Sequence, residues 1–263
     1  MERCDFLPVS AEEMHERGWW WYDALVVGGD AYVDHPSFGT AVISRVLEAE
    51  GLRVAVLAQP DWHDAEAFRA MGRPRLGVFI GAGNLDSMVA HYTAAKRRRS
   101  EDFYSPGKRT GCRPDRAAIV YCNRAREAFG PDMPIILGSL EASLRRFAHY
   151  DYWDDSVRRA ILFDAPADLL VYGMGEAATI EIARRLKKKQ SVRTMTDIPG
   201  TGYITRDPSV CKFDHITLPS FEDVRDDKRL YAEATRTEYA EHDPVRGRAM
   251  IQPCEGRYLV INP

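Results

Sequence analysis

Hydrophobic and polar residues alternate along the first two thirds of the chain in the manner of strands followed by helices. Short, mainly apolar runs, typical of buried parallel strands, occur at residues 24–27, 53–58, 76–80, 134–137 and 169–172. Apolar residues at helical spacing predict helices at residues 37–50, 64–71, 85–99, 113–129 and 176–189. We therefore predict an α/β fold with a doubly wound, mainly parallel, five-stranded sheet.

The segments that flank this alternation have a different pattern. Residues 1–23 form a leader that we expect to pack on the core, with a short helix capped by Ser10 and Glu13. Residues 24–190 form the predicted Rossmann-like domain, with a loop at 100–113. Residues 191–263 are expected to be an extension, in which the pattern predicts strands at 198–205 and 258–261 and a polar helix at 221–241.

Glycines with polar neighbours follow four of the predicted strands. In open α/β sheets, ligands bind where the carboxyl ends of the strands meet, and exposed backbone N–H groups there suit a phosphate or a large cofactor tail. We expect these four strand ends to converge on one hollow. The candidate cofactor-binding residues are Gly29, Asp30, Asp34, His35, Gly81, Gly83, Asn84, Asp86, Gly138, Glu141, Arg145, Gly173, Gly175 and Glu176.

Several of these residues also have a structural interpretation. Asp30 and Asp34 either face a ligand or accept hydrogen bonds from loop amides, and His35 either takes part in chemistry or caps a helix. Glu141 and Arg145 are four residues apart, which is the spacing of an ordinary helical ion pair. One loop offers too few ligands for a metal site, so we predict none in this chain.

Composition narrows the class of protein further. Apolar residues make up 45% of the chain and charged residues 29%, and the formal net charge is −3, so the whole molecule is not a polycation. No apolar run approaches the roughly 20 residues of a membrane-spanning helix, and the N-terminus lacks a signal core, so we expect a cytoplasmic protein. Five scattered cysteines without C-x2-C spacing indicate reduced thiols.

One basic segment supports an alternative function. Residues 96–116 hold three acidic and eight basic residues, with Phe103 and Tyr104 between them, an arrangement that suits RNA or another polyanion. Cations that complement a helix end are the structural alternative. The basic residues are Lys96, Arg97, Arg98, Arg99, Lys108, Arg109, Arg113 and Arg116.

Longer motifs resemble the N-terminal region of the YgiQ-type radical SAM family. They include G-D-A-Y-V-D-H-P-S-F-G at 29–39, G-N-L-D-S-M-V-A-H-Y-T-A at 83–94 and E-A-S-L-R-R-F-A-H-Y-D-Y-W at 141–153. The resemblance implies a cobalamin-binding-type Rossmann domain that precedes a radical SAM barrel. In the family, that barrel carries a C-x3-C-x2-C triplet, which holds a [4Fe–4S] cluster and leaves one iron for S-adenosylmethionine.

That triplet is absent here, so the resemblance implies an N-terminal fragment or a truncated gene product without catalytic activity of its own. We expect an accessory domain that binds a cofactor or a substrate, with the barrel of the parent chain as its partner and a small molecule or RNA as substrate. The D-x-H-x-x-G signature of cobalamin ligation is not matched, because Asp34 and His35 are adjacent. Cobalamin bound without a protein ligand stays open, as does a self-sufficient enzyme that binds a phosphorylated molecule near residues 81–86.

Overall fold

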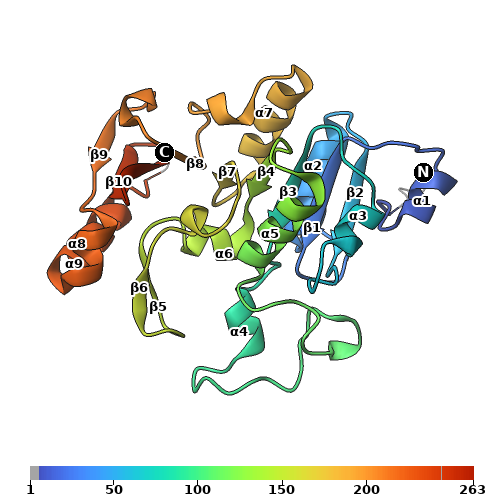
Figure 1. The fold of residues 1–263 in the computed structure, drawn as a ribbon, viewed down its shortest axis with the longest axis horizontal. Coiled ribbons are helices and arrows are strands. Elements are labelled where there is room, and N and C mark those ends of the chain that lie inside the picture. The colour runs from blue at the N-terminus through green and yellow to red at the C-terminus, as the bar shows by residue number, and fades with distance from the viewer. Residues whose placement is uncertain (1–5, 244) are drawn as a thin grey trace.

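The computed structural model describes residues 6–243 and 245–263. In this part of the chain the main element is a single nine-stranded sheet, which runs through the molecule from β2 to β9 (Figure 1). Its strands, in spatial order, are β2 (Val54–Ala58), β1 (Ala24–Gly28), β3 (Gly77–Gly81), β4 (Ile135–Leu137), β7 (Leu169–Val171), β8 (Thr201–Thr205), β11 (Arg257–Ile261), β10 (Ala249–Cys254) and β9 (His215–Thr217).

The five strands predicted from apolar runs form the parallel half of this sheet, in the order β2-β1-β3-β4-β7. The prediction of a five-stranded sheet is wrong, because the same sheet continues through β8, β11, β10 and β9. β8 pairs antiparallel with β7, and β11 pairs antiparallel with both β8 and β10. Gln252 and Pro253 interrupt the apolar pattern of β10, and β9 is three residues long, so neither strand produces a clear signal in the sequence.

Helices cover both faces of the parallel half. On one face, α2 (Gly39–Ala49) and α7 (Glu176–Lys187) bury Leu47 and Ile182 with Val26 and Phe79 of the sheet. The other face is covered by α3 (Glu66–Ala70), α5 (Ala117–Phe129) and α6 (Ser139–Leu144), which pack on residues such as Leu25, Ile80 and Leu137. The doubly wound arrangement follows from side chains that alternate between the faces.

Three predicted helices differ from the observed ones. The helix expected at residues 85–99 is only α4 (Ser87–His91), because Tyr92 is extended and pairs with Arg98 in an isolated bridge. α5 begins at Ala117 rather than at 113, since Arg116 adopts a left-handed conformation. The helix expected at residues 221–241 is divided into α8 (Phe221–Asp226) and α9 (Lys228–Ala240) by the extended residue Asp227.

The remaining elements are short. α1 (Ala11–Glu16) forms at the predicted place, with the Ser10 side chain accepting a hydrogen bond from the Glu13 N–H. A hairpin projects between the two halves of the molecule in Figure 1 and consists of β5 (His149–Asp151) and β6 (Ser156–Arg158). Single 3-10 turns occur at Pro106–Lys108, Ile161–Phe163, Val192–Thr194 and Pro208–Val210.

Glu238 on α9 makes the stability of the C-terminal region sensitive to pH. Burial raises the pKa of this half-buried carboxyl from 4.5 to about 7, and the nearby Arg146 only partly opposes the shift. The folded state therefore holds a proton that the unfolded state releases between these two values, so stability falls as the pH rises through 7. We expect Glu238→Gln to raise the unfolding temperature at pH 8 and to raise it much less at pH 5.

Thermal unfolding followed by circular dichroism at both pH values measures this effect. Glu233→Gln, at an exposed position on the same helix, is the matched control and should change neither temperature. An equal shift of Glu238→Gln at pH 5 and pH 8 would show that titration is not the cause.

Candidate functional site

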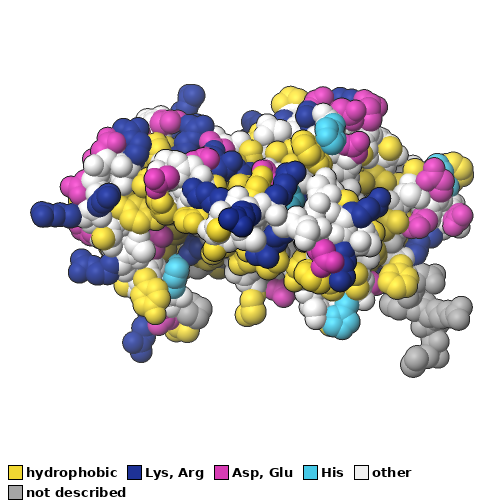
Figure 2. All heavy atoms as spheres, turned by 90° about the horizontal axis from the view of Figure 1, so that it is seen from below, with side chains coloured by type: hydrophobic (Ala, Val, Ile, Leu, Met, Phe, Trp, Pro, Cys, Tyr) yellow, Lys and Arg dark blue, Asp and Glu magenta, His cyan; other side chains and the backbone are white. Residues whose placement is uncertain are grey.

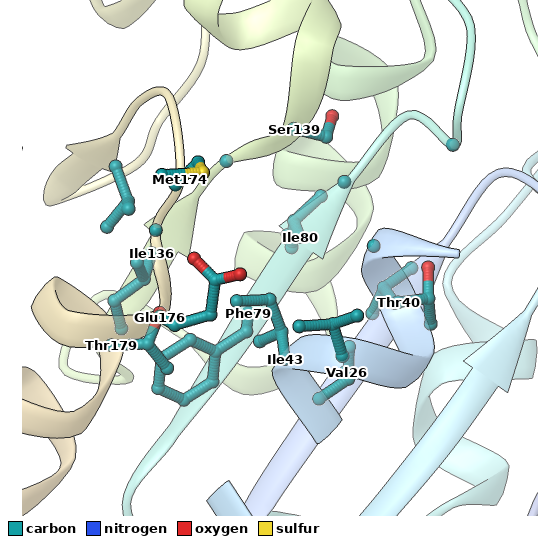
Figure 3. Close-up of a pocket in the computed structure, with 18 of the residues that line it drawn as sticks. Val26, Thr40, Ile43, Phe79, Ile80, Ile136, Ser139, Met174, Glu176 and Thr179 are labelled. Carbon is teal, nitrogen blue, oxygen red and sulfur yellow. The ribbon is translucent and has the colours of Figure 1, made fainter. Parts of the chain in front are cut away.

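A pocket of about 320 Å³ lies between α2 and α7, on the face of the sheet that these helices cover (Figure 3). Its floor is made by apolar side chains of four neighbouring parallel strands, which are Val26, Phe79, Ile136 and Val171. Its mouth is formed by backbone at the carboxyl ends of β3, β4 and β7, where Gly81, Gly138 and Gly173 lie. The pocket is therefore at the edge where open α/β sheets bind ligands.

The way the two helices pack explains why this space is open. Near their C-terminal ends α2 and α7 are joined, because Arg184 forms an ion pair with Glu50 at 2.8 Å and Lys187 donates to the Glu50 carbonyl at 2.9 Å. Their N-terminal ends lie on either side of the pocket, at Thr40 and Glu176. The connection from β1 leads to β2 on one side, whereas β3 lies on the other, so this is the point where the strand order reverses.

The chemistry of the pocket is mainly apolar. Glu176 is the only ionisable residue among those that line it, and Figure 3 shows its carboxylate pointing into the pocket from the first turn of α7. Thr40, Ser139 and Thr179 add hydroxyl groups. A flat apolar group that carries a hydrogen-bond donor suits this lining, whereas a phosphate would meet a carboxylate and no cation.

The loop amides that were expected to bind an anion are occupied by the protein's own carboxylates. The Asn84 N–H donates to Asp30 at 2.7 Å, and the Ser87 N–H donates to Glu141 at 2.9 Å. Asp86 caps α4 by accepting hydrogen bonds from the N–H groups of Met88 and Val89. A phosphorylated ligand near residues 81–86 would have to displace these internal acceptors.

Arg113 anchors this arrangement of acids. Its side chain is fully buried and lies between Asp30, at 2.8 Å, and Asp102, at 2.9 Å. Burial raises the pKa of Asp30, and hydrogen bonds from Asn84 and Arg113 oppose that change. Glu141 is also fully buried, which raises its pKa, and it accepts a hydrogen bond from the Ala118 N–H at 3.0 Å. These contacts join the loops after β1 and β3 to α5.

The remaining acidic candidates are paired in the same way. Asp34 pairs with Arg45 of α2, and Asp86 pairs with Arg145. His35 is exposed, and its Nδ1 accepts a hydrogen bond from the Ser37 N–H at 3.1 Å.

The predicted site residues thus fall into two groups. Those that line the pocket are Gly81, Gly83, Gly138, Gly173, Gly175 and Glu176. Those that do not line it are Gly29, Asp30, Asp34, His35, Asn84, Asp86, Glu141 and Arg145. Phe79, Thr40 and Thr179 also line the pocket but were not predicted from the sequence. The only sequence feature that could have indicated them is their position on the faces of β3, α2 and α7 that pack against each other.

Several basic residues of the segment at residues 96–116 form ion pairs with acidic residues of the same protein. Arg113 is buried as described, Arg116 pairs with Asp151 at 2.9 Å and with Asp154 at 2.7 Å, and Lys108 lies 3.7 Å from Glu101. The segment does not end a helix, because α4 stops at His91. Figure 2 shows lysine and arginine side chains mixed with hydrophobic ones across the middle of the face seen from below.

The residues that the structure describes do not fit an iron–sulfur cluster. Within residues 6–243 and 245–263, no group of three or more His, Cys, Asp or Glu side chains is placed to hold a metal ion. Cys112, Cys122, Cys211 and Cys254 are free thiols. Burial raises the pKa of both Cys122 and Cys254, so neither thiol is activated as a thiolate.

None of the helices in the described residues has the length and apolar character that a membrane span requires.

A doubly wound sheet with a pocket at the point where its strand order reverses places the chain among the open α/β domains. The chain belongs to the family described as Radical SAM N-terminal, whose model matches residues 6–263. The resemblance to the N-terminal region of YgiQ-type proteins is thereby confirmed.

Curated relatives include a UPF0313 protein of Clostridium botulinum (strain 657 / Type Ba4), which is 53% identical over 263 residues. A UPF0313 protein of Clostridium perfringens (strain SM101 / Type A) is 52% identical over 262 residues. The match covers all of this chain but only 41% and 39% of these relatives, so the chain spans about two fifths of their length.

Among solved structures, the chain is similar to the radical S-adenosylmethionine methyltransferase TsrM from Kitasatospora setae, which was solved with cobalamin and a [4Fe–4S] cluster bound. The identity is 20% and the TM-score is 0.42, and the match covers 68% of this chain and 26% of that one.

Proposed function

We propose that this chain is the N-terminal accessory domain of a radical SAM iron–sulfur enzyme, and that it binds a cofactor or a substrate without being catalytic alone. The observation that carries the proposal is the pocket between α2 and α7, which opens at the carboxyl edge of the parallel strands. The [4Fe–4S] cluster and S-adenosylmethionine belong to the part of the parent that lies beyond this region.

The pocket favours the tail of a large cofactor over a phosphate. The aromatic ring of Phe79 and the aliphatic side chains around it suit a flat heteroaromatic group, and Glu176 suits a donor on that group. The nucleotide base of cobalamin is such a group. A histidine ligand to its cobalt is not part of the proposal, because His35 does not line the pocket.

The surface around the pocket supports a partner that covers it. Met174, Leu144 and Leu140 are exposed at the carboxyl edge, by 91%, 59% and 44%. Residues 262 and 263 lie at the same edge, since the Tyr172 hydroxyl donates to the Asn262 carbonyl at 2.5 Å. We propose that the barrel of the parent enzyme contacts this edge and closes over the ligand.

Equilibrium dialysis with hydroxocobalamin, followed by its visible absorption, tests the binding proposal. We expect one equivalent to be retained, and we expect Thr179→Trp, which fills the pocket, to weaken retention about tenfold or more. Thr235→Trp, at an exposed position on α9, is the matched control. Circular dichroism verifies that both variants are folded, and equal retention by both would contradict this use of the pocket.

The enzymatic part of the proposal requires the full-length parent. Anaerobic reconstitution with iron, sulfide and S-adenosylmethionine should give a cluster that cleaves S-adenosylmethionine to 5′-deoxyadenosine. A parent that assembles no cluster under these conditions would remove the enzymatic part and leave the binding result intact.

A further inference from the structure

A second cavity of about 520 Å³ lies at the opposite edge of the sheet from the pocket described above. It is formed where β7 begins, β8 ends and β11 begins, beneath α5 and the 3-10 turn Ile161–Phe163. Its lining includes the apolar residues Phe163 and Ile204 and the polar residues Asn123, Arg206 and Arg257. It lies at the other edge of the sheet from the α2–α7 pocket and on the other face.

The two arginines face each other across neighbouring strands. Thr205 of β8 is the partner of Tyr258 of β11 in an antiparallel pair; Arg206 follows Thr205 and Arg257 precedes Tyr258, so the two arginines come next in the same register. Side chains alternate along a strand, which places Arg206 on the same face as Ile204 and therefore on the α5 side. Like charges directly opposite each other in an antiparallel pair are destabilising.

No acidic side chain in the described residues forms an ion pair with either arginine. Asp164 is the only acid that lines the cavity, and it is engaged by Arg159 at 2.7 Å and by Arg158 at 3.2 Å. The Arg257 guanidinium lies 4.8 Å from the centre of the Phe163 ring, which holds it at the cavity wall. The cavity therefore presents two positive charges that are not neutralised within the protein.

We propose that this cavity binds the phosphate group of a small phosphorylated molecule. Guanidinium groups recognise phosphate oxygens through charge-assisted, often bidentate hydrogen bonds, and two of them match the two charges of a phosphate monoester. The apolar wall at Phe163 and Ile204 leaves room for the body of the molecule. The site is independent of the proposed accessory role, since no residue of the α2–α7 pocket lines it.

Isothermal titration calorimetry with AMP, and separately with inorganic phosphate, tests the proposal at constant ionic strength. We expect both probes to bind, and Arg206→Gln and Arg257→Gln each to weaken binding about tenfold or more. Arg97→Gln and Arg236→Gln, each a single variant at an exposed position outside the cavity, make the same change in net charge as each cavity variant and should bind like the wild type.

Thermal unfolding provides a second test, because the difference in unfolding temperature between the wild type and Arg206→Gln should reverse its sign when phosphate is added. Without phosphate, Arg206→Gln relieves the repulsion between opposed charges and should unfold at the same temperature as the wild type or a higher one. With saturating phosphate, the wild type should gain stability that the variant does not gain.

Two outcomes would overturn the proposal. One is binding of AMP that is equal in the wild type and in Arg206→Gln. The other is loss of binding to a 20-nucleotide RNA in Arg206→Gln without any binding of AMP, which would assign the arginines to a nucleic-acid backbone. Loss of cobalamin retention in Thr179→Trp with AMP binding unchanged would keep the two sites distinct.

Discussion

Arg113→Met should lower the free energy of unfolding by about 3–5 kcal/mol, the cost of removing one partner from a buried ion pair. The guanidinium is fully buried and forms hydrogen bonds with Asp30 and with both oxygens of Asp102. The methionine side chain fills similar space, so the effect reports the two carboxylates left without a cation. Urea unfolding at pH 7, followed by tryptophan fluorescence, measures it.

The pH dependence of this variant identifies the cause. The pKa of Asp30 is already raised by burial, and losing Arg113 raises it further, so the folded variant binds a proton that the unfolded chain releases. The stability of Arg113→Met should therefore increase as the pH falls from 7 toward 5. Adding Asp30→Asn and Asp102→Asn should restore part of the loss at pH 7.

Arg124→Met, on α5, is the matched control, because Arg124 is partly exposed, pairs with the exposed Glu127 and otherwise donates only to the backbone carbonyls of Trp62 and His63. Surface pairs of this kind contribute about 0–1 kcal/mol, so a small effect is expected. A loss for Arg113→Met as small as that for Arg124→Met would show that the buried triad does not hold the loops together.

The parallel half of the fold could be predicted because its strands are buried on both faces. Every residue of β1 is buried, so its sequence is a continuous apolar run that periodicity detects. In the antiparallel half, the pattern predicts strands at the places of β8 and β11 but misses β9 and β10, since His215 and Thr217 of β9 are exposed and Pro253 interrupts β10. Its pairing depends on contacts between residues far apart in the chain.

The predicted site residues lie near the edge of the sheet where the pocket opens, but Glu176 is the only one of them that lines the pocket with a side chain. Glycines mark the ends of strands, and Gly81, Gly138 and Gly173 do lie at the pocket mouth. Asp30 has the same local pattern in the sequence, but Arg113, 83 residues away, pairs with it. A partner at that separation leaves no local signal, so a buried structural acid and a ligand-binding acid look alike.

Gly29→Ala should lower the free energy of unfolding by about 3 kcal/mol, the upper end of the usual cost of overpacking. A methyl group at this position would collide with the Ala82 carbonyl, whose oxygen lies closer than any van der Waals contact and whose carbon lies at 2.6 Å. The obstacle is backbone, so no change of side-chain rotamer relieves it. The loops after β1 and β3 would have to separate.

That separation should also change the pocket, because Ala82 lies between Gly81 and Gly83, which both line it. At temperatures where Gly29→Ala is folded, we expect weaker cobalamin retention than in the wild type. Gly39→Ala is the control for stability alone, because Gly39 itself lines the pocket. A methyl group there meets nothing within 4 Å, and Gly39 begins α2, where alanine is tolerated. A Gly29→Ala protein as stable as Gly39→Ala would mean that these two loops do not approach each other as closely as the structure places them.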